Sequence, residues 1–355
     1  MDTLSHGLLG AAIGQGVFGR KLGWRATVIG VVAAELPDLD FFLHSTSDPL
    51  LNIELHRHFT HSFAFAPVIA VLATSPWLLR SEFKPHRLAL LLCGLAGCCS
   101  HILLDACTSY GTQFLVPFSQ HRFGWDFISI IDPVFTLVLM CGLVVNLCLR
   151  RRSSAESDGS NRPVWIALAI CFSYLALGAW QKVRAQTAQA SLARSRGHRI
   201  VRSEVMPTLA NQLVWRSLYL HGGRIHSDRL RVSWFGAATV RLGDSLPLVT
   251  ALDLTPTEAV RIIRHDSFAR FTHLTDGWVA RAPGDPTVIG DMRYSLSTRA
   301  FDPIWGIRFT PPGAHTEIEW VNRSRSRSLS LAELWSELIG AHAEYRPLPR
   351  IPLAN

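Results

Sequence analysis

The 355-residue sequence is poor in charged residues, and its second half contains no cysteine. Only 17% of the residues are charged, whereas a soluble domain usually carries about 25%. All seven cysteines lie between Cys93 and Cys171, mostly inside apolar runs, where a cysteine behaves as a small hydrophobic residue. No CxxC pair and no regularly spaced set is present, so neither a zinc ribbon nor a disulfide scaffold is expected.

The sequence also lacks the signatures of several enzyme classes. It contains no GxSxG elbow and no Walker A lysine motif, which disfavours serine catalysis and P-loop nucleotide hydrolysis. Gly14, Gly16 and Gly19 match GxGxxG, but they follow an apolar helical run instead of a strand, so a dinucleotide site is not expected. The N-terminus has no basic region before its apolar stretch, and we expect no cleaved signal peptide.

Long apolar runs dominate the first half of the chain. A membrane-spanning helix needs ~20 mainly apolar residues. The runs at 131–149 and 163–180 meet this requirement, and the run at 88–107 does so despite ionisable residues near its end. Further apolar runs lie at 26–43 and 62–79, with a short, glycine-rich one at 3–18. We therefore predict about five to six membrane helices.

The second half of the chain changes character after residue 181. Residues 182–202 are basic and predict a linker or a surface helix. The segments QLVWRSLYL and RLRVSWFG alternate apolar and polar residues around a Gly-Gly turn, which predicts a β-hairpin. Ser330 and Glu333 are spaced as a capping box and predict a terminal helix. The predicted architecture is an all-α polytopic membrane bundle at 1–181, the basic linker, and a smaller, mainly β soluble domain at 203–355.

The net charge of +8 is distributed as in a membrane protein. Ten lysines and arginines lie in three alternate loops of the first half, and two lie in the loops between them. Cytoplasmic loops carry this excess, so we expect the N-terminus and the C-terminal domain on the outer, periplasmic side of a bacterial inner membrane. The basic stretch 182–202 opposes this orientation, but long domains translocate largely regardless of charge. We expect the lipid bilayer, and not nucleic acid, as the partner.

Polar residues gather at alternate ends of successive apolar runs. Because successive membrane helices run in opposite directions, these ends lie at the same membrane face. Ionisable residues beside membrane segments are costly and are candidates for function. The five clusters are His6; Glu35, Asp38 and Asp40; His56, His58, Thr60, His61 and Ser62; His101 and Asp105; and Asp126 and Asp132. We expect these five clusters to converge on the outer face.

The residue types in these clusters point to a metal. His101 and Asp105 are four residues apart on one helix face, and His58 and His61 share a face if their segment is helical. Imidazole and carboxylate bind Zn²⁺, Mn²⁺ or Fe, and the lack of nearby thiolates favours an open, catalytic type of site. We predict one or two divalent ions, zinc first and manganese as the alternative. The predicted ligands are His6, Asp40, His61, His101 and Asp105.

Other residues of the clusters are predicted to act around the metal. Asp38, as a further ligand or general base, and His58 are the candidate catalytic residues. Structural interpretations remain open, because an isolated HxxxD pair can be a hydrogen-bonded pair and Asp38 or Asp132 alone can cap a helix. His56 is expected to be an interfacial or capping residue. The candidates for substrate binding or ligand orientation are Arg57, Thr60, Ser62, Asp126 and Asp132.

Five segments in order carry a family resemblance. MDTLSHGLLGAAIG, LPDLD, HRHFTHS, HILLDACTSYGT and DFISIIDP, within residues 1–140, resemble the YdjM/YbcI-like (DUF457) bacterial inner-membrane proteins, a family described as metal-dependent hydrolases. That family looks distantly similar to zinc-dependent phospholipase C and P1-type nucleases, which are helical phosphoesterases. The resemblance implies ligands at His6, Asp38 or Asp40, His61, His101 and Asp105. No downstream His-x-x-x-Glu helix follows, so it does not extend to a three-metal site.

Three functions compete on this basis. The first is a membrane-bound metal-dependent hydrolase that cleaves a phosphoester or lipid-linked bond with metal-activated water. The second is a non-catalytic membrane anchor with a structural metal or polar cluster and a β domain that binds a partner. The third, an ion transporter, requires polar residues in the middle of several spans, and the runs at 131–149 and 163–180 contain few.

Overall fold

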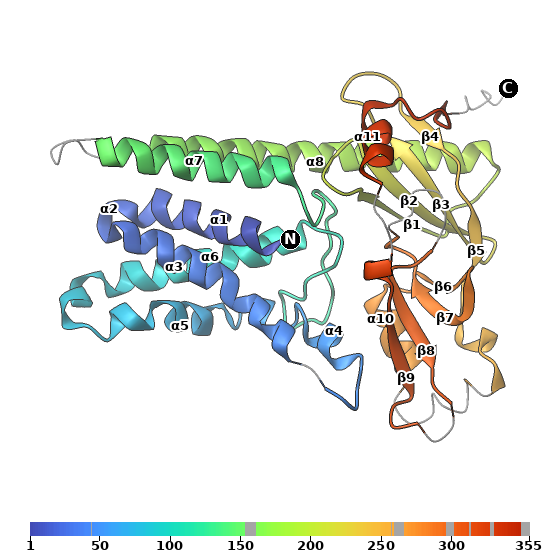
Figure 1. Ribbon diagram of the computed structural model, residues 1–355, viewed down its shortest axis with the longest axis horizontal. Helices are drawn as coiled ribbons and strands as arrows, with labels where there is room; N and C mark the ends of the chain where they lie inside the picture. Colours follow the sequence, from blue (N-terminus) through green and yellow to red (C-terminus); the bar gives the residue numbers. More distant parts are fainter. Residues whose placement is uncertain are drawn as a thin grey trace. The chain divides into compact units, whose positions relative to one another are not determined.

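The computed structural model describes residues 1–43, 45–152, 161–256, 258, 266–295, 302–311, 314–326 and 330–348. The chain divides into two compact units (Figure 1). The first, here the helical unit, comprises Met1–Leu43, Leu55–Trp180 and Leu209–Gln212. The second, here the sheet unit, comprises His44–Glu54, Gln181–Thr208 and Leu213–Asn355.

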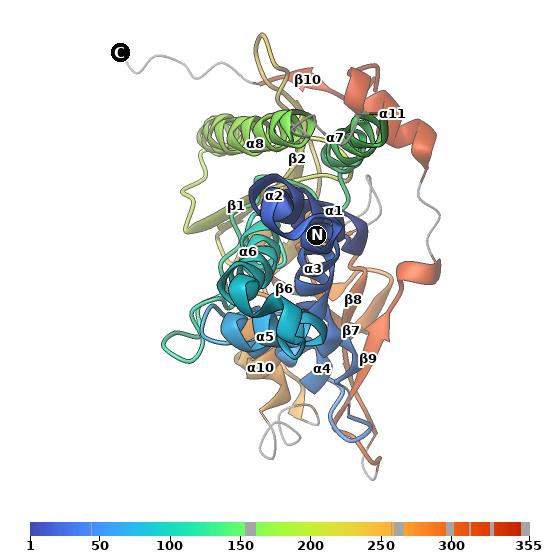
Figure 2. The same ribbon diagram turned by 90° about the vertical axis from the view of Figure 1, so that its left-hand side faces the viewer.

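Helices of very different length build the helical unit. They are α1 (Thr3–Ile13), α2 (Gly19–Leu22), α3 (Trp24–Glu35), α5 (Ala66–Leu78), α6 (Arg87–Ala106), α7 (Pro133–Arg152) and the first part of α8 (Arg162–Ser195). A π-helical turn (Gly14–Phe18) and 3₁₀ turns (Leu36–Phe42, Phe59–His61, Ser81–His86) connect them. Helices α1, α3, α6 and α5 pack as neighbours (Figure 2).

Glycines let α1 and α3 pack with their backbones in contact. A Cβ atom added at Gly10 would lie 2.2 Å from the Gly30 carbonyl oxygen, and one added at Gly14 would lie equally close, 2.2 Å, to the Ala26 carbonyl. Small residues at such an interface allow close helix approach inside a bilayer. This packing fixes the start of α1 and the end of α3 against α6, where the ionisable residues lie.

Fewer helices are long enough to cross a membrane than the sequence suggests. Among the described residues, three helices qualify by length and apolar composition: Ser81–Ala106, Pro133–Arg151 and Arg162–Ser195. The bent pair Leu51–His61 and Ala66–Leu78 raises the number to four at most. The predicted five to six spans are therefore not confirmed. In particular, α3 ends after 12 residues because Pro37 begins the 3₁₀ turn Leu36–Phe42, and 12 residues reach only ~18 Å.

Two antiparallel sheets form most of the sheet unit. The first has the order β1-β2-β3-β4-β10, with β5 paired to β3, and the second has the order β6-β7-β8-β9 (Figure 1). The strands are β1 (Arg202–Pro207), β2 (Val214–His221), β3 (Arg224–Arg231), β4 (Thr239–Arg241), β5 (Ser245–Pro247), β6 (Val279–Ala282), β7 (Asp285–Asp291), β8 (Trp305–Phe309), β9 (Ile318–Asn322) and β10 (Arg346–Pro347). Among the described residues, three α-helices accompany them: α4 (Leu51–Leu55), α10 (Ser267–Leu274) and α11 (Leu331–Ile339).

Local sequence signals of the sheet unit match its structure. The predicted hairpin is β2–β3, and its turn residues Gly222 and Gly223 both have positive φ, at 57° and 71°. That conformation favours glycine and suits a two-residue hairpin turn. The Ser330 hydroxyl accepts a hydrogen bond from the Glu333 backbone and caps α11. Both features were readable from local spacing.

The basic stretch after residue 181 is mostly helical. Residues 182–195 continue α8 without a break, and only the part after Ser195 connects to β1. Ala185, Ala188 and Leu192 lie on one face of this helix and pack on Trp215 and Leu230 of the first sheet. The predicted boundary at 181/182 therefore falls inside a helix, whose second part belongs to the core of the sheet unit.

Candidate metal centre

The last turn and a half of α6 supplies two of the candidate ligands. His101 and Asp105 are separated by one helical turn, and both side chains are completely buried. The Nε2 atom of His101 lies 3.5 Å from Oδ2 of Asp105. Burying a carboxylate beside an imidazole is costly unless a proton or a cation is shared between them.

A short 3₁₀ turn supplies the third candidate ligand. Pro37 ends the α3 geometry, and in the turn Leu36–Phe42 the carboxylates of Asp38 and Asp40 alternate with the apolar side chains of Leu39 and Phe41. Asp40 is buried, whereas the Asp38 side chain keeps 27% of its surface exposed. The turn thus directs two acidic groups inward and its apolar groups outward.

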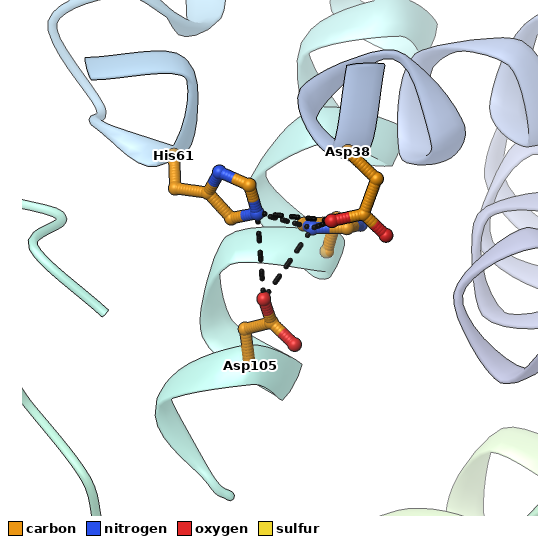
Figure 3. A group of neighbouring side chains, drawn as sticks. Asp38, His61 and Asp105 are labelled. Carbon is orange, nitrogen blue, oxygen red and sulfur yellow. Dashed lines mark hydrogen bonds and ion pairs between the residues drawn. The ribbon is translucent and has the colours of Figure 1, made fainter. Parts of the chain in front are cut away.

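The fourth candidate ligand, His61, ends the turn Phe59–His61 and is completely buried. Its Nε2 atom lies 2.9 Å from Nε2 of His101, 3.3 Å from Oδ1 of Asp38 and 3.4 Å from Oδ2 of Asp105. Figure 3 shows Asp38 and Asp105 approaching this nitrogen from different directions. One ligand atom from each of these four residues lies within 4.8 Å of all the others.

These distances fit the coordination shell of a small divalent ion. Zinc binds nitrogen and oxygen ligands at about 2.0–2.1 Å, which places tetrahedral ligands about 3.3 Å apart. The separations that involve His61 range from 2.9 to 3.4 Å, and His101 Nε2 lies 3.6 Å from Asp38 Oδ1. Two carboxylates, one buried and one partly exposed, and two buried imidazoles that converge on one point are therefore a donor set suited to a metal.

Asp40 holds His61 in the orientation that this donor set needs. Oδ2 of Asp40 lies 3.1 Å from Nδ1 of His61 and accepts hydrogen bonds from the Thr60 hydroxyl (2.7 Å) and the Arg57 backbone (3.1 Å). The Thr60 hydroxyl, which donates to Asp40, also lies 3.0 Å from Nδ1 of His61. An oxygen that accepts the Nδ1 proton leaves the Nε2 lone pair directed at the cluster, the usual arrangement behind a metal-bound histidine. The other oxygen of Asp40, Oδ1, lies 2.8 Å from Nδ1 of His56.

Asp105 is held from the opposite side by cationic and imidazole groups. The Arg57 guanidinium places Nε 2.8 Å from Oδ2 of Asp105 and donates to the Thr108 hydroxyl at 3.0 Å. His6 Nε2 lies 3.0 Å from Oδ1 of Asp105, an oxygen that also accepts from the Met1 amino group. The His6 ring stacks on the His101 ring, with centroids 3.8 Å apart.

The structure thus separates the residues predicted as ligands into two kinds. His61, His101 and Asp105 belong to the four-residue group together with Asp38, which the sequence analysis treats as catalytic. His6 and Asp40 do not belong to that group but contact its members. Asp40 forms a second group of ligand atoms with Asp38 and His56.

Several other predicted site residues have structural contacts. The Ser62 hydroxyl donates to the Phe59 carbonyl (2.8 Å) and accepts from the Phe65 backbone at the start of α5. Asp132 Oδ1 accepts from the backbones of Val134 and Phe135, which is the helix-capping interpretation left open above.

Two further predicted residues also lie outside both groups of ligand atoms. His58 stands before the turn Phe59–His61 with non-helical φ and ψ, so it does not share a face with His61. Asp126 is buried, with a left-handed backbone (φ 50°).

Two contacts of the site carried little signal in the sequence. The sequence predicts an interfacial or capping role for His56, whereas the structure places it against Asp40. Its place in the HRH triplet is a weak signal for such a contact. Tyr110 was not singled out. Its ring lies 4.9 Å from the Arg57 guanidinium, 5.4 Å from that of Arg122 and 5.6 Å from the His56 ring. A tyrosine in a loop is too common a feature to be found without the fold.

Comparison with known proteins agrees with this membrane architecture. The family model described as YdjM inner membrane protein matches residues 1–185, about half of the chain. The Escherichia coli (strain K12) inner membrane protein YbcI is 30% identical over 132 residues, which cover 36% of this chain and 75% of that protein. No solved structure matches. The match includes every residue of the candidate metal centre, and the chain belongs to the YdjM inner membrane protein family.

Proposed function

We propose that this protein is a membrane-bound metal-dependent hydrolase that cleaves a phosphoester or another bond of a lipid-linked substrate. The observation that carries the proposal is the four-residue group of Asp38, His61, His101 and Asp105. Its atoms have the spacing of a metal shell, and three of its members are buried while Asp38 is partly exposed. Catalytic metal sites use three protein ligands and keep one position open to water or substrate, whereas structural sites are closed. In this proposal His61, His101 and Asp105 would be the three ligands, and the partly exposed Asp38 would face the water.

A bound divalent ion would act as a Lewis acid and lower the pKa of water, so that hydrolysis proceeds at neutral pH. The residues of the chain supply the remaining functions. Asp38, at the exposed edge, is positioned to take a proton from water as the water attacks the phosphorus or carbonyl atom. The bond to the alcohol oxygen then breaks, and Asp38 returns the proton to that oxygen.

The residues behind the ligands act in this proposal by positioning. Asp40 orients His61, and Arg57 orients Asp105. The Arg57 guanidinium is buried and engaged by Asp105 and Thr108, so of the two roles expected from the sequence we assign it ligand orientation and not substrate binding.

The surface beside Asp38 favours a lipid-linked substrate. Phe41 and Phe42 are 66% and 71% exposed, and Leu39 is also exposed, in the same short turn as the ligand. Exposed large apolar side chains beside a polar site mark a surface that meets lipid or another apolar partner. A substrate with an apolar tail and a polar, hydrolysable head would satisfy both parts of this turn.

The test compares the purified full-length protein in detergent with His101→Ala and with the control Ser100→Ala. Ser100 precedes His101 on α6, and its hydroxyl donates to the Gly97 carbonyl of the same helix. We expect the wild type and Ser100→Ala to hold metal and to hydrolyse a phosphodiester or ester probe in mixed micelles. His101→Ala should do neither.

Metal content that is unchanged in His101→Ala would overturn the proposed centre. Metal held by the wild type without hydrolysis of either class of probe would support the alternative, a membrane anchor with a structural metal. The two results are independent, because the first is read by elemental analysis and the second by product release.

A further inference from the structure

Helix α11 of the sheet unit is amphipathic, and its apolar face is exposed. Leu331, Trp335 and Ile339 follow one another at intervals of four residues, so they share one helix face. They are 73%, 62% and 51% exposed. Within α11, which the structure describes throughout, only Glu337 is buried. An amphipathic helix usually turns its apolar face to the core. The apolar face of α11 is instead left uncovered by the described part of the sheet unit.

Two arginines of the first sheet hold the polar face of α11. Nη1 of Arg241 donates to the Glu337 carboxylate at 2.8 Å. Nε and Nη2 of Arg231 donate to the Leu338 carbonyl, near the end of the helix, at 3.2 and 3.1 Å. A buried carboxylate is tolerated where a guanidinium neutralises it. These contacts fix the helix with its charged face inward, so the outward direction of the apolar face is part of the fold.

The same Arg231 connects α11 to the loop between β3 and β4, which carries an exposed aromatic side chain. Its Nη1 donates to the Ser233 hydroxyl at 2.7 Å, and two residues later Phe235 is 94% exposed. Helix α8 holds the loop as well. Arg184 donates from Nη1 to the Ser233 carbonyl at 2.7 Å and from Nη2 to the Gly236 carbonyl at 3.2 Å. The loop is therefore fixed by both α11 and α8.

Helix α8 holds this loop at the point where its own apolar run ends. The apolar run covers residues 163–180, and the next residue, Gln181, donates from Nε2 to the Val232 carbonyl at 2.9 Å. Trp180, at the end of the run, is half exposed. In a spanning helix, the change from apolar to polar residues and a tryptophan beside it mark the membrane–water interface. The loop that carries Phe235 is thus attached at the level of the lipid head groups.

We propose that α11 and the loop between β3 and β4 form a membrane-docking surface of the sheet unit. Phe235, Leu331, Trp335 and Ile339 insert between the lipid head groups and the first carbons of the acyl chains. Amphipathic helices that lie in the plane of the interface bury tryptophan and leucine in this way. The occupant is the bilayer because a helix with a membrane-spanning apolar run carries the loop at the end of that run. The docking surface does not depend on the metal centre.

The test uses the full-length protein, labelled with fluorotryptophan, in bilayer nanodiscs of phosphatidylethanolamine and phosphatidylglycerol. Trp335→Phe identifies the fluorine resonance of Trp335. We expect a lipid with a spin label near its head group to remove most of the intensity of this resonance, and a water-soluble gadolinium chelate to leave most of it. Phe235→Asp should reduce the effect of the lipid and increase that of the chelate, because a carboxylate enters the bilayer only at a cost. The control Leu252→Asp places the same charge at another exposed side chain of the sheet unit and should behave as the wild type.

Three results would overturn the docking surface. A Trp335 resonance that the chelate removes and the spin-labelled lipid leaves would mean that α11 faces water. A resonance that neither reagent affects would mean that a protein surface, from a second copy of the chain or from another protein, covers the helix. A Phe235→Asp variant that matches Leu252→Asp would mean that the loop and α11 do not form one surface.

Discussion

The two units bury charged side chains by different chemistry. In the sheet unit, three buried carboxylates pair with guanidinium groups. Asp291 lies 3.0 Å from Arg293, Glu337 lies 2.8 Å from Arg241, and Asp228 lies 2.7 Å from Arg196. In the helical unit, the buried carboxylates of Asp40 and Asp105 both meet the His61 imidazole, and Asp105 meets the Arg57 guanidinium as well. The first arrangement is permanently charged, and the second can exchange its protons for a metal.

The geometry of the two kinds of contact differs as well. Arg196 donates from Nη1 and Nη2 to the two oxygens of Asp228 at 2.7 and 2.8 Å, so donor and acceptor satisfy each other. In the candidate metal centre, the imidazole nitrogens and carboxylate oxygens of four residues converge on one point instead of forming separate donor–acceptor pairs. A buried ion pair can be structural, but four groups directed at one point require an ion or a proton between them.

The comparison is tested most strongly by replacing Asp105 with asparagine. We expect Asp105→Asn to lower metal affinity by more than 100-fold and to destabilise the helical unit by about 3–5 kcal/mol, because Arg57 loses its buried carboxylate. Metal content and thermal unfolding in detergent measure the two effects. Ser100→Ala, the matched change on α6, should keep its metal and lose at most about 1 kcal/mol. Full occupancy in Asp105→Asn would place the metal elsewhere.

The corresponding change in the sheet unit should affect stability alone. Arg293→Met removes the guanidinium from Asp291, which is buried, and from Asp276, which is half exposed. We expect a loss of about 3 kcal/mol, the lower end for a broken buried pair, with unchanged metal content. Arg308→Met, whose partners Asp285 and Glu319 are partly exposed, should cost about 1 kcal/mol or less. A loss of metal in Arg293→Met would contradict the view that the ion pairs of the sheet unit act on stability alone and the helical unit alone holds the metal.

The parts of the fold that could be predicted depend on local sequence. The β2–β3 hairpin follows from a Gly-Gly turn between alternating strands, and the α11 cap follows from Ser330. The number of membrane spans does not follow, because apolarity along the chain does not reveal where Pro37 ends α3. A helix beyond residue 181 follows from the sequence only as the alternative to a linker, because the basic residues there obscure the small apolar residues that pack on the first sheet.

The candidate site also has a part that local sequence predicts and a part that it does not. The pairing of His101 with Asp105 follows from helical spacing, and the alternating direction of the apolar runs predicts that distant clusters meet. The positive φ of Arg57 (62°) and the turn that follows it separate His58 from His61, and no helical spacing rule anticipates that change. Which oxygen of which aspartate faces the centre depends on contacts between segments that are remote in sequence.

Metal binding should protect only the helical unit against opening. A ligand at 100 times its dissociation constant stabilises the native state by about 2.7 kcal/mol. We therefore expect hydrogen exchange at the end of α6 and in the turn Phe59–His61 to slow when metal is added, with no change in β2 and β3. His101→Ala should show no such slowing. Equal protection of both units would mean that the ion acts on the whole chain and not at the four-residue group.

The smallest expected effect is a pH dependence of the sheet unit. Burial, together with the neighbouring His198 and Arg196, lowers the pKa of His226 to about 4. An unfolded histidine has a pKa of about 6.5, so between these values the unfolded chain binds more protons than the folded one. Stability should therefore fall as the pH is lowered from about 6.5 to about 4. Because His226 is partly exposed, the loss should be on the order of 1 kcal/mol.

A His226→Gln variant isolates this effect from that of the other histidines. Tyr219 stacks on the His226 ring at 4.8 Å, and His198 lies 4.6 Å from it, while Asp228 and His221 are the further charged or titratable neighbours. Glutamine cannot take up a proton. The free energy of opening in β2 and β3, obtained from hydrogen exchange after correction for the intrinsic pH dependence of the exchange rate, should therefore vary less between pH 7.5 and pH 5 in the variant. An identical pH dependence in the two proteins would assign the effect to His198, whose pKa burial also lowers. It would also mean that His226 does not titrate against the stability of the sheet unit, although its pKa is lowered in the folded chain.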